Sequence, residues 1–470
     1  MSNVVLTYYS DYGESFYNSL KEELLGAGNN VLQLNLNNSI FYVSGWAGET
    51  DVLSEAAFNE IRRFEPDLFI SFNNSLPKSV FEEYKGKRPI LVIDADNPNT
   101  FFNKEYLLKD YEYLTFGGLQ LESKELLVKT FGILDELQYF FLPAATSMTN
   151  RQLDAKYNIS FIGSNFYPVN FPGDPLFFTS YAGYLYEQLK RNYYLTSADV
   201  SRVMVGKKET DDLIPTLRSF YAGQLRLKYL GVLADLGLKI FGSRGWERVG
   251  LYDLDLFTCF DSSPINDNKQ ASNVYNSSKI CLNISHPQAV SAFSWRVMDI
   301  MATSGCLITE SKPAFDYLFG DYLSKETMDV ITFNDRFELR EKSKFLLLNS
   351  AIRDKAVSEL NFAIEENGRW KKRFETMEHY FLIPLTSGSN NKLKKCYSLE
   401  LSSKDSLTSC FGSSFIKKPG PLKKKLSADK RIKLLGALFL LFLSQIPFLG
   451  KLVPIEKFRL VERSFNLLKK

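Results

Sequence analysis

The sequence predicts an α/β protein built from two parallel-sheet lobes with a cleft between them. Strand-like and helix-like segments alternate over residues 1–145, and a second alternating series starts near residue 157. The chain has 470 residues, which is too long for a single compact core. Strands separated by helices pair in parallel and carry helices on both faces of the sheet. We therefore expect two such sheets.

The first lobe is predicted to span residues 1–145. Its expected strands are NVVLTY, VLQLNL, DLFISF, PILVID, YLTFGG and YFFLPA. Apolar residues at helical spacing separate these strands. Ligands of parallel sheets bind at the carboxyl ends of the strands. The loops at residues 9–13, 73–74 and 94–99 are therefore the expected ligand-facing loops of this lobe.

The second lobe is predicted to span residues 155–385. Its expected strands lie in YNISFIGS, GLKIFGS, SKICLNIS, CLITE and VITFN. Residues 176–236 are mostly helical in pattern and long for one connection, so they predict an inserted helical subdomain. The helix near residues 369–380 is expected to end this lobe and can cross back to the first.

The rest of the chain changes character. Residues 386–430 are polar, serine-rich and then basic, as expected of a linker. Residues 431–470 contain an apolar run that is shorter than the roughly 20 residues of a membrane span. Basic residues beside such a run favour a membrane-associating tail that lies on an anionic surface. A helix docked on the protein's own core is the alternative.

Composition favours a reducing compartment. Hydrophobic residues make up 45% and charged residues 24% of the chain, an ordinary globular balance. The five cysteines are odd in number and form no C-x-x-C pair, which argues against disulfides and a zinc site. The N-terminus lacks the basic start of a signal peptide. We expect a cytoplasmic protein, held by its tail at the inner face of the plasma membrane.

The most specific pattern lies around residues 275–320. The run YNSSKICLNISHPQAVSAFSWRVMDIMATSGCLITESKPAFDYLFGD resembles the C-terminal signature of CgeB/YkvP-like glycosyltransferases. That signature has an asparagine-containing strand, an Arg-x-x-Glu helix, a small-residue turn and an apolar strand. ILVIDADNP, YNISFIGS and GLKIFGSRGW are weaker similarities in the expected order. The resemblance extends over residues 1–385.

This resemblance implies the GT-B fold, in which the first of two Rossmann-like lobes binds mainly the acceptor and the second binds the donor. It implies a metal-independent glycosyltransferase that moves a sugar from a nucleotide-diphosphate sugar to a cell-surface glycan, lipid-linked or protein acceptor. No cofactor and no nucleic-acid partner are expected. Two alternatives stay open: a GT-B-fold nucleotide-sugar epimerase, and a non-catalytic scaffold of an envelope or spore layer.

The residues that bind the donor nucleotide are predicted on the short helix after the asparagine strand. Ser294 is a plausible N-cap, which would place Arg296 in the first turn. A guanidinium there can hold phosphate oxygens in a forked geometry. Asp299 lies on the same face three residues on. By resemblance its carboxylate binds the ribose, although the family usually has Glu at this position. A plain Arg296–Asp299 surface ion pair is the alternative.

Other donor-side candidates lie at turns and strand ends. Gly305 closes a small-residue turn, where its simplest role is a helix C′ residue with positive φ. Glu310 ends the following strand and either binds a sugar hydroxyl or caps a loop. The family often places an arginine shortly after the first strand-end glycine; it is missing here, and Arg226 or Arg244 would replace it. The predicted donor-binding set is Gly163, Ser164, Gly242, Ser243, Asn283, Arg296, Asp299, Gly305 and Glu310.

The catalytic candidates are Asp94, Asp96 and His286. Either aspartate could deprotonate an acceptor hydroxyl in an inverting reaction. A D-x-D metal site at the same two carboxylates is rejected, because that motif belongs to a single-lobed architecture. His286 either donates to the sugar or phosphate or is structural. The predicted acceptor-side residues are Tyr9, Ser10, Asp11 and Gly13.

Overall fold

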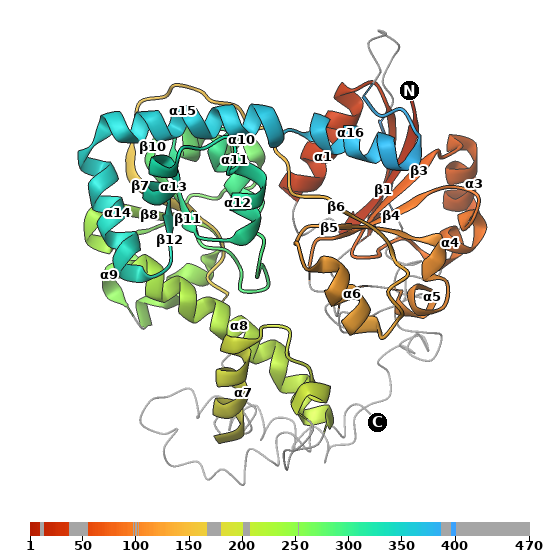
Figure 1. Cartoon of the computed structure of the whole chain (residues 1–470), viewed down its shortest axis with the longest axis horizontal. Helices are drawn as coiled ribbons and strands as arrows, with labels where there is room; N and C mark the ends of the chain where they lie inside the picture. The colour runs from red at the N-terminus through yellow and green to blue at the C-terminus, as the bar shows by residue number, and fades with distance from the viewer. Residues whose placement is uncertain are drawn as a thin grey trace, which may run out of the picture. The chain divides into compact units, whose positions relative to one another are not determined.

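The computed structural model describes residues 1–9, 14–36, 55–96, 98, 101, 103–166, 180–200, 207–251, 253–386 and 396–400 (Figure 1). Met1–Cys410 form one compact unit and Phe411–Lys470 a second. The predicted membrane-associating tail lies outside the described residues, as do Ser10, Asp11 and Gly13. No helix among the described residues is long and apolar enough to cross a membrane.

The first sheet is parallel, with seven strands in the order β13-β2-β1-β3-β4-β5-β6. Its strands are β1 (Asn3–Tyr9), β2 (Asn30–Leu36), β3 (Leu68–Phe72), β4 (Ile90–Asp94), β5 (Thr115–Gly118), β6 (Gln138–Phe141) and β13 (Cys396–Glu400). Without β13, this order places the change in crossover direction between β1 and β3. That point is where doubly wound sheets bind ligands.

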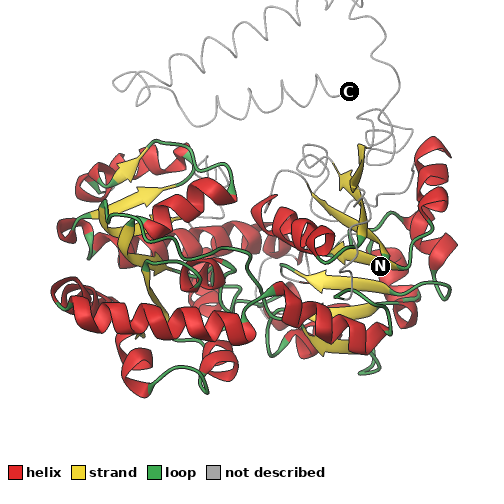
Figure 2. Cartoon of the chain, turned by 90° about the horizontal axis from the view of Figure 1, so that it is seen from above, coloured by secondary structure: helices red, strands yellow, loops and turns green. Residues whose placement is uncertain are grey.

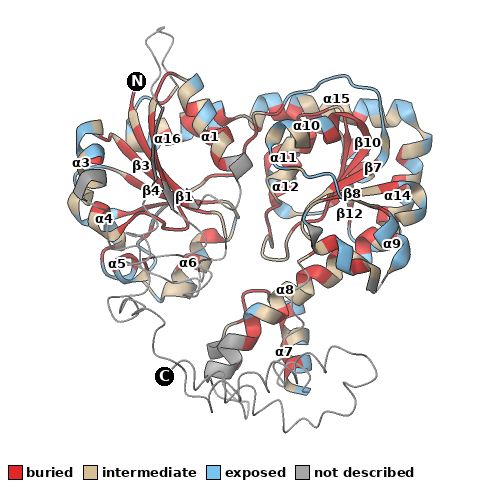
Figure 3. Ribbon diagram, turned by 180° about the vertical axis from the view of Figure 1, so that it is seen from behind, coloured by how far each residue is buried: buried red, intermediate tan, exposed pale blue. Residues whose placement is uncertain are grey.

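Helices cover both faces of this sheet (Figures 1 and 3). One face packs on α1 (Glu14–Gly26) and α16 (Trp370–Phe381). The other packs on α3 (Glu55–Phe64), α4 (Lys78–Tyr84), α5 (Lys104–Lys109) and α6 (Ser123–Phe131). Alternate residues of β1 serve the two cores: Val4 and Leu6 face α1, and Val5 faces the opposite side. A strand buried on both faces explains the continuous apolar run in the sequence.

The second sheet is also parallel, with six strands in the order β12-β11-β10-β7-β8-β9. Its strands are β7 (Tyr157–Ile162), β8 (Leu238–Phe241), β9 (Phe260–Asp261), β10 (Ser278–Asn283), β11 (Cys306–Glu310) and β12 (Thr332–Phe333). Numbered from β7, this is the Rossmann order 3-2-1-4-5-6, with the change in crossover direction between β7 and β10. The predicted fold class, α/β with two Rossmann-like lobes, is confirmed; Figure 2 shows the strands of each lobe among their helices.

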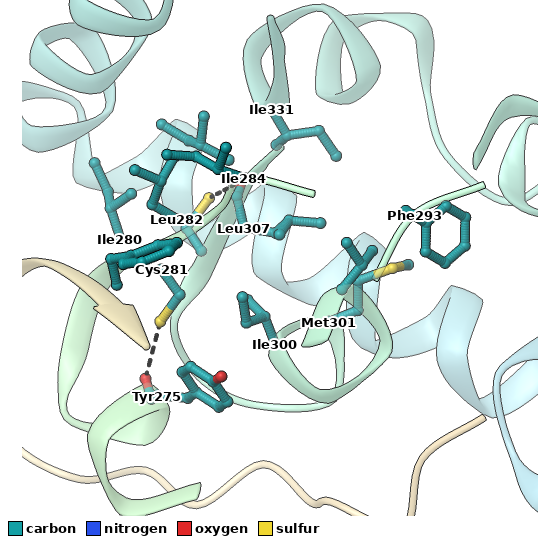
Figure 4. Close-up of a cluster of buried hydrophobic side chains, with 14 of the residues drawn as sticks. Tyr275, Ile280, Cys281, Leu282, Ile284, Phe293, Ile300, Met301, Leu307 and Ile331 are labelled. Atoms are coloured by element: carbon teal, nitrogen blue, oxygen red, sulfur yellow. Dashed lines mark hydrogen bonds between the residues drawn. The ribbon is translucent and has the colours of Figure 1, made fainter. Parts of the chain in front are cut away.

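The helices of the second lobe follow the alternation predicted from the sequence. They are α7 (Ser180–Arg191), α8 (Lys207–Gly231), α9 (Leu254–Thr258), α10 (Asn268–Asn276), α11 (Arg296–Met301), α12 (Pro313–Phe319), α13 (Lys325–Ile331), α14 (Arg336–Leu348) and α15 (Ser350–Asn367). Both α7 and α8 lie in the range of the predicted helical insertion and share a small core of their own. In α11, Ile300 and Met301 belong to the same core as Ile280, Leu282 and Leu307 (Figure 4).

The chain returns to the first lobe after α15. The indole Nε1 of Trp370 donates to Ser19 Oγ at 2.8 Å, so α16 crosses back, as the sequence allows. Strand β13 then pairs with β2 inside the range predicted as a linker, and that prediction is wrong for residues 396–400. The physical reason is that β2 would otherwise be an edge strand with a row of unpaired backbone groups.

Candidate functional site

Polar residues gather at the two points where the crossover direction changes. In the second sheet, Gly163 follows β7 and Asn283 ends the neighbouring β10. In the first sheet, Asn73 follows β3, and Asp96 follows β4 beside it. The carboxyl edge at such a point is the expected ligand site of a doubly wound sheet. These two edges are therefore the candidate site.

Two guanidinium groups meet at Gly163. A Cβ built on this glycine would lie 3.1 Å from Nη1 of Arg226 and 3.1 Å from Nη2 of Arg296. Arg226 comes from α8 and is only 3% exposed. Its Nη1 donates to the Ser164 carbonyl, and its Nη2 donates to the Ile284 carbonyl at 3.4 Å. Its Nε is buried and has no hydrogen-bond partner among the described residues.

Neither guanidinium has a carboxylate partner in the described part of the chain, where the arginines that form salt bridges are others. Burial, together with the neighbouring charge of Arg296, lowers the pKa of Arg226 well below its ordinary value, and Glu310 opposes this shift. Both guanidinium groups also lie over the Phe161 ring, at 5.2 and 5.4 Å. Like charges in a low-dielectric environment repel, so a bound anion would stabilise this pair. Arg226 thus lies at the first strand-end glycine, and its contact with phosphate stays a prediction; the side chain of Arg244 lies outside the described residues.

Asn283 orients Arg296. Its Oδ1 accepts from Arg296 Nη1 at 3.1 Å and from Ser294 Oγ at 2.6 Å. Its Nδ2 donates to Ser285 Oγ at 3.1 Å and to Thr309 Oγ1 at 3.0 Å, and the side chain is fully buried. Ser294 is therefore not the N-cap that the sequence predicted, because its hydroxyl serves a buried acceptor. The N-cap position belongs to the next residue, which makes no side-chain cap.

Asp299 faces the connection between the lobes. Its Oδ1 accepts from Thr146 Oγ1 at 2.6 Å. Burial raises the pKa of Asp299 to about 6, while the Thr146 hydrogen bond and the charge of Arg296 oppose that rise. The alternative of an Arg296–Asp299 ion pair is wrong, because the described contacts of the two side chains run instead to Asn283 and Thr146. Ribose binding by Asp299 stays a prediction.

The glycines have separate roles. A Cβ on Gly242 would lie 2.3 Å from the Gly163 carbonyl oxygen, so this residue lets the ends of β7 and β8 approach closely. A Cβ on Gly305 would lie 2.3 Å from Cys281 Sγ. Gly305 precedes β11, at the amino edge of the sheet, which contradicts its predicted contact with donor. Its predicted positive φ is also wrong, because close packing rather than a left-handed turn requires the glycine.

Glu310 and Ser243 lie at the carboxyl edge of the second sheet. Glu310 Oε2 accepts from the backbone N–H of Ser285 at 2.7 Å and so holds the loop after β10. Burial raises the pKa of Glu310, whereas Lys312, the Ser285 N–H and Arg226 oppose the rise. Ser243 is exposed, and its carbonyl accepts from the Trp246 N–H at 3.1 Å. The predicted contacts of Glu310 and Ser243 with a sugar donor stay predictions.

His286 follows β10 and lies between aromatic side chains. Burial and the charges of Arg226 and Arg218 lower the pKa of His286 to about 3. Its Nδ1 accepts from the Gln288 N–H at 3.3 Å, so Nε2 carries the proton. The ring makes edge contacts with Phe166 at 4.6 Å and Tyr193 at 5.5 Å. A group with this pKa is a poor acid–base catalyst near neutral pH. Donation to a sugar or phosphate and a structural role both stay predictions.

The two aspartates at the end of β4 differ in environment: Asp94 is the last residue of the strand, and Asp96 follows it. Asp94 is 6% exposed, and its Oδ1 accepts from the Leu119 N–H at 2.6 Å. Burial raises the pKa of Asp94 to about 7, and its bonds to Ser123 and Leu119 oppose the rise. Asp96 is only partly buried, and both of its oxygens accept hydrogen bonds from side-chain amides. Asp96 is therefore the better placed of the two to meet an acceptor hydroxyl.

No role was predicted for two residues that hold Asp96. Asn73 Nδ2 donates to Asp96 Oδ2 at 2.8 Å, and Gln288 Nε2 donates to Oδ1 at 3.0 Å. A signal for Asn73 existed, since residues 73–74 follow a predicted strand at the ligand edge. Gln288 carried no such signal. Of the predicted acceptor-side residues, only the backbone of Tyr9, which ends β1, is described.

No group of three His, Cys, Asp or Glu side chains among the described residues is arranged to hold a metal ion. Residues 224–379 match the family model described as "Glycosyl transferase-like". These residues include the C-terminal part of α8, with Arg226, and the whole segment from β10 to β11. No curated protein sequence matches the chain.

Solved structures of similar architecture include three from different sources. T4 phage BGT in complex with UDP and Mn2+ is 11% identical, with 82% of this chain and 100% of that chain covered and a TM-score of 0.45. Sucrose-phosphate synthase from Thermosynechococcus elongatus is 11% identical, with 81% and 98% covered and a TM-score of 0.46. Anabaena HepE in complex with UDP and glucose is 10% identical, with 82% and 100% covered and a TM-score of 0.44.

Proposed function

We propose that this protein is a glycosyltransferase that moves a sugar from a nucleotide-diphosphate sugar to a hydroxyl of a cell-surface glycan, lipid-linked or protein acceptor. The observation that carries the proposal is the pair of guanidinium groups, Arg226 and Arg296, at Gly163. They lack carboxylate partners among the described residues and lie where a doubly wound sheet binds its ligand. The match of residues 224–379 to a glycosyl transferase-like family model supports it.

The diphosphate would lie against Arg226 and Arg296, because forked guanidinium donors match phosphate oxygens. A cation at this position stabilises the negative charge that develops on the leaving diphosphate. His286 would donate from Nε2 to a sugar or phosphate oxygen. Asp299 is the proposed ribose ligand, and Glu310 is the proposed ligand of a sugar hydroxyl.

Asp96 would act as the base of an inverting reaction. Its carboxylate takes the proton of the acceptor hydroxyl as that oxygen bonds to the anomeric carbon of the sugar. The bond from the anomeric carbon to the phosphate oxygen breaks at the same time, and its electron pair leaves with the diphosphate. In this scheme the chain's own side chains supply the base and the positive charge, so no metal is required.

The proposed kind of acceptor and the proposed cellular location are both inferred from the C-terminal tail. The basic residues of 417–433 and the apolar run that follows favour an anionic membrane surface, where lipid-linked acceptors lie. We therefore place the protein in the cytoplasm, at the inner face of the plasma membrane.

The test has two arms. Calorimetry with UDP, GDP, CDP, ADP and dTDP should reveal binding of at least one, and radiolabelled sugars of that nucleotide should be hydrolysed slowly without acceptor. Arg296→Met should abolish this binding with nearly unchanged melting temperature, because the side chain is only half-buried. Arg340→Met, which removes a surface pair with Asp235, is the matched control and should bind normally. Failure of wild-type protein to bind any nucleoside diphosphate would refute the proposal.

A further inference from the structure

Asp96 receives hydrogen bonds from both lobes. Asn73 of the first lobe donates to Oδ2 at 2.8 Å, and its own Oδ1 accepts from the Asp96 backbone N–H at 3.0 Å. Gln288, in the loop after β10 of the second lobe, donates to Oδ1 at 3.0 Å. Asn73 has φ of 51°, an unusual conformation for a residue with a side chain. The first lobe thus fixes one carboxylate oxygen, and the second lobe fixes the other.

The loop that carries Gln288 is bound firmly to the first lobe. The Val290 N–H donates to Gln120 Oε1 at 2.8 Å, and Ser291 Oγ accepts from the Leu121 N–H at 3.0 Å. The Ser291 N–H donates to Glu122 Oε1 at 3.1 Å. These contacts place Gln288 opposite Asp96.

The same loop begins at the donor side. His286 lies two residues before Gln288, and the Gln288 N–H donates to its Nδ1. The imidazole ring in turn contacts Phe166, whose ring lies 4.1 Å from the Arg226 guanidinium carbon. A continuous set of contacts therefore joins the arginine pair to Asp96.

We propose that Gln288 is a positioning residue that completes the Asp96 base from the opposite lobe. This inference rests on the proposed transfer reaction, in which Asp96 takes the acceptor proton. Hydrogen bonds donated to a carboxylate fix its orientation and the direction of its remaining lone pairs. Asp96 is fully oriented only while residues 286–291 are docked. Proton removal from the acceptor is thereby confined to the arrangement in which the donor-side loop is in place.

The kinetic arm of the test separates positioning from binding. Gln288→Met keeps the length of the side chain but removes both donors. We expect kcat for transfer to fall about tenfold, a fraction of the 10²–10⁴ that a general base contributes, while the Kd for the nucleoside diphosphate stays unchanged. In an Asp96→Asn background, Gln288→Met should have no further effect on kcat. Gln138→Met, at an exposed glutamine on β6, is the control.

Two kinetic results would overturn the inference. Equal losses of kcat with and without Asp96 would show that Gln288 acts elsewhere, and loss of nucleotide affinity would show that it only supports the donor site. Full activity of Asp96→Asn would instead refute the proposed base.

The second arm needs no activity, so it separates failure of the inference from failure of the proposed function. In protein labelled with ¹⁵N-glutamine, loss of a side-chain signal in Gln288→Met assigns that residue. Asp96→Ala should shift this signal and leave the Gln138 signal unchanged, because Gln288 is the one of these two glutamines that contacts Asp96. An unshifted Gln288 signal would overturn the inference even if no donor is ever found.

Discussion

Asn283 and Arg296 are joined by a hydrogen bond of 3.1 Å from the guanidinium Nη1 to the carboxamide Oδ1. The bond links the last residue of β10 to the first residue of α11. The same Oδ1 also accepts from Ser294 Oγ. Because the Asn283 carboxamide carries no charge, it orients the Arg296 side chain without neutralising the positive charge of the guanidinium. The charge of Arg296 therefore stays available to a bound anion.

Asn283→Asp tests this point with almost no change in size. A carboxylate at this position would pair with Arg296 and compete with phosphate, while Ser285 and Thr309 can turn their hydroxyls to donate to it. We expect nucleoside diphosphate affinity to fall by about tenfold or more, as measured by calorimetry. Asn158→Asp, at an exposed asparagine on β7, is the control. Unchanged affinity in Asn283→Asp would contradict the proposed role of Arg296.

Gly163→Ala should weaken the same binding. The added methyl would lie 3.1 Å from both guanidinium groups and would force them to move. We expect about a tenfold loss of nucleotide affinity, equivalent to about 1.4 kcal/mol. In Gly183→Ala the new methyl meets nothing within 4 Å, so this variant on α7 should bind normally. It should also gain roughly 0.5–1 kcal/mol in free energy of unfolding, because alanine favours helix. Equal affinities of the two variants would argue against an anion at Gly163.

His286 should remain neutral across the physiological range. Because its pKa is lowered to about 3, its ring C–H signal in the proton NMR spectrum should not move between about pH 5 and 8. Loss of a signal in His286→Asn assigns it. The unfolded side chain titrates near 6.5, so the free energy of unfolding should decrease as the pH falls from about 6.5 towards 3. A midpoint near pH 6.5 in the folded protein would contradict the buried donor role.

Asp299 should make stability depend on pH in the opposite direction. Its folded pKa of about 6 lies above the unfolded value near 3.9, so the folded state binds the proton more tightly. The free energy of unfolding should therefore fall as the pH rises from about 4 to 6 and stay level above. The loss would be on the order of 2–3 kcal/mol.

Asp299→Asn should remove this loss, because an amide can still accept from Thr146. Relative to wild type, the variant should become more stable as the pH rises from 4.5 to 7 in denaturant unfolding. Asp329→Asn, at an exposed aspartate on α13, is the comparison variant. A difference between variant and wild type that does not change with pH would rule out a buried, proton-binding Asp299.

Deletion of residues 417–470 should release the protein from anionic liposomes and leave nucleotide hydrolysis intact. The basic and apolar residues that favour a membrane surface lie in this segment, whereas both sheets lie before it. Co-sedimentation with vesicles containing phosphatidylserine measures the release, with neutral vesicles as the control. Unchanged binding by the shortened protein would refute the membrane-associating tail.

Local pattern was sufficient for the fold class but not for the whole site. Strands such as β1 and β4 are mostly apolar, and segments with apolar residues at helical spacing separate the strands, so the parallel sheets could be predicted. Arg296 was predicted because it lies on the short helix after the asparagine strand, in a pattern that resembles the family's Arg-x-x-Glu helix. The Asp96–Gln288 contact joins residues 192 positions apart, and no local signal marks it. Residues 396–400 were not predicted as a strand because they pair with β2, which is distant in the sequence, and no local pattern marks this pairing.

The connection of α16 to the first lobe has a consequence during synthesis. Trp370 bonds to Ser19 across 351 positions, and the Ser2 hydroxyl donates to the Pro384 carbonyl across 382. At 5–20 residues per second, a ribosome needs roughly 20–70 seconds to deliver the helix that covers α1. The apolar face of the earliest helix therefore stays uncovered while the whole second lobe emerges. The lobe that is made first is completed last, and a chain arrested before residue 370 would present that face to chaperones.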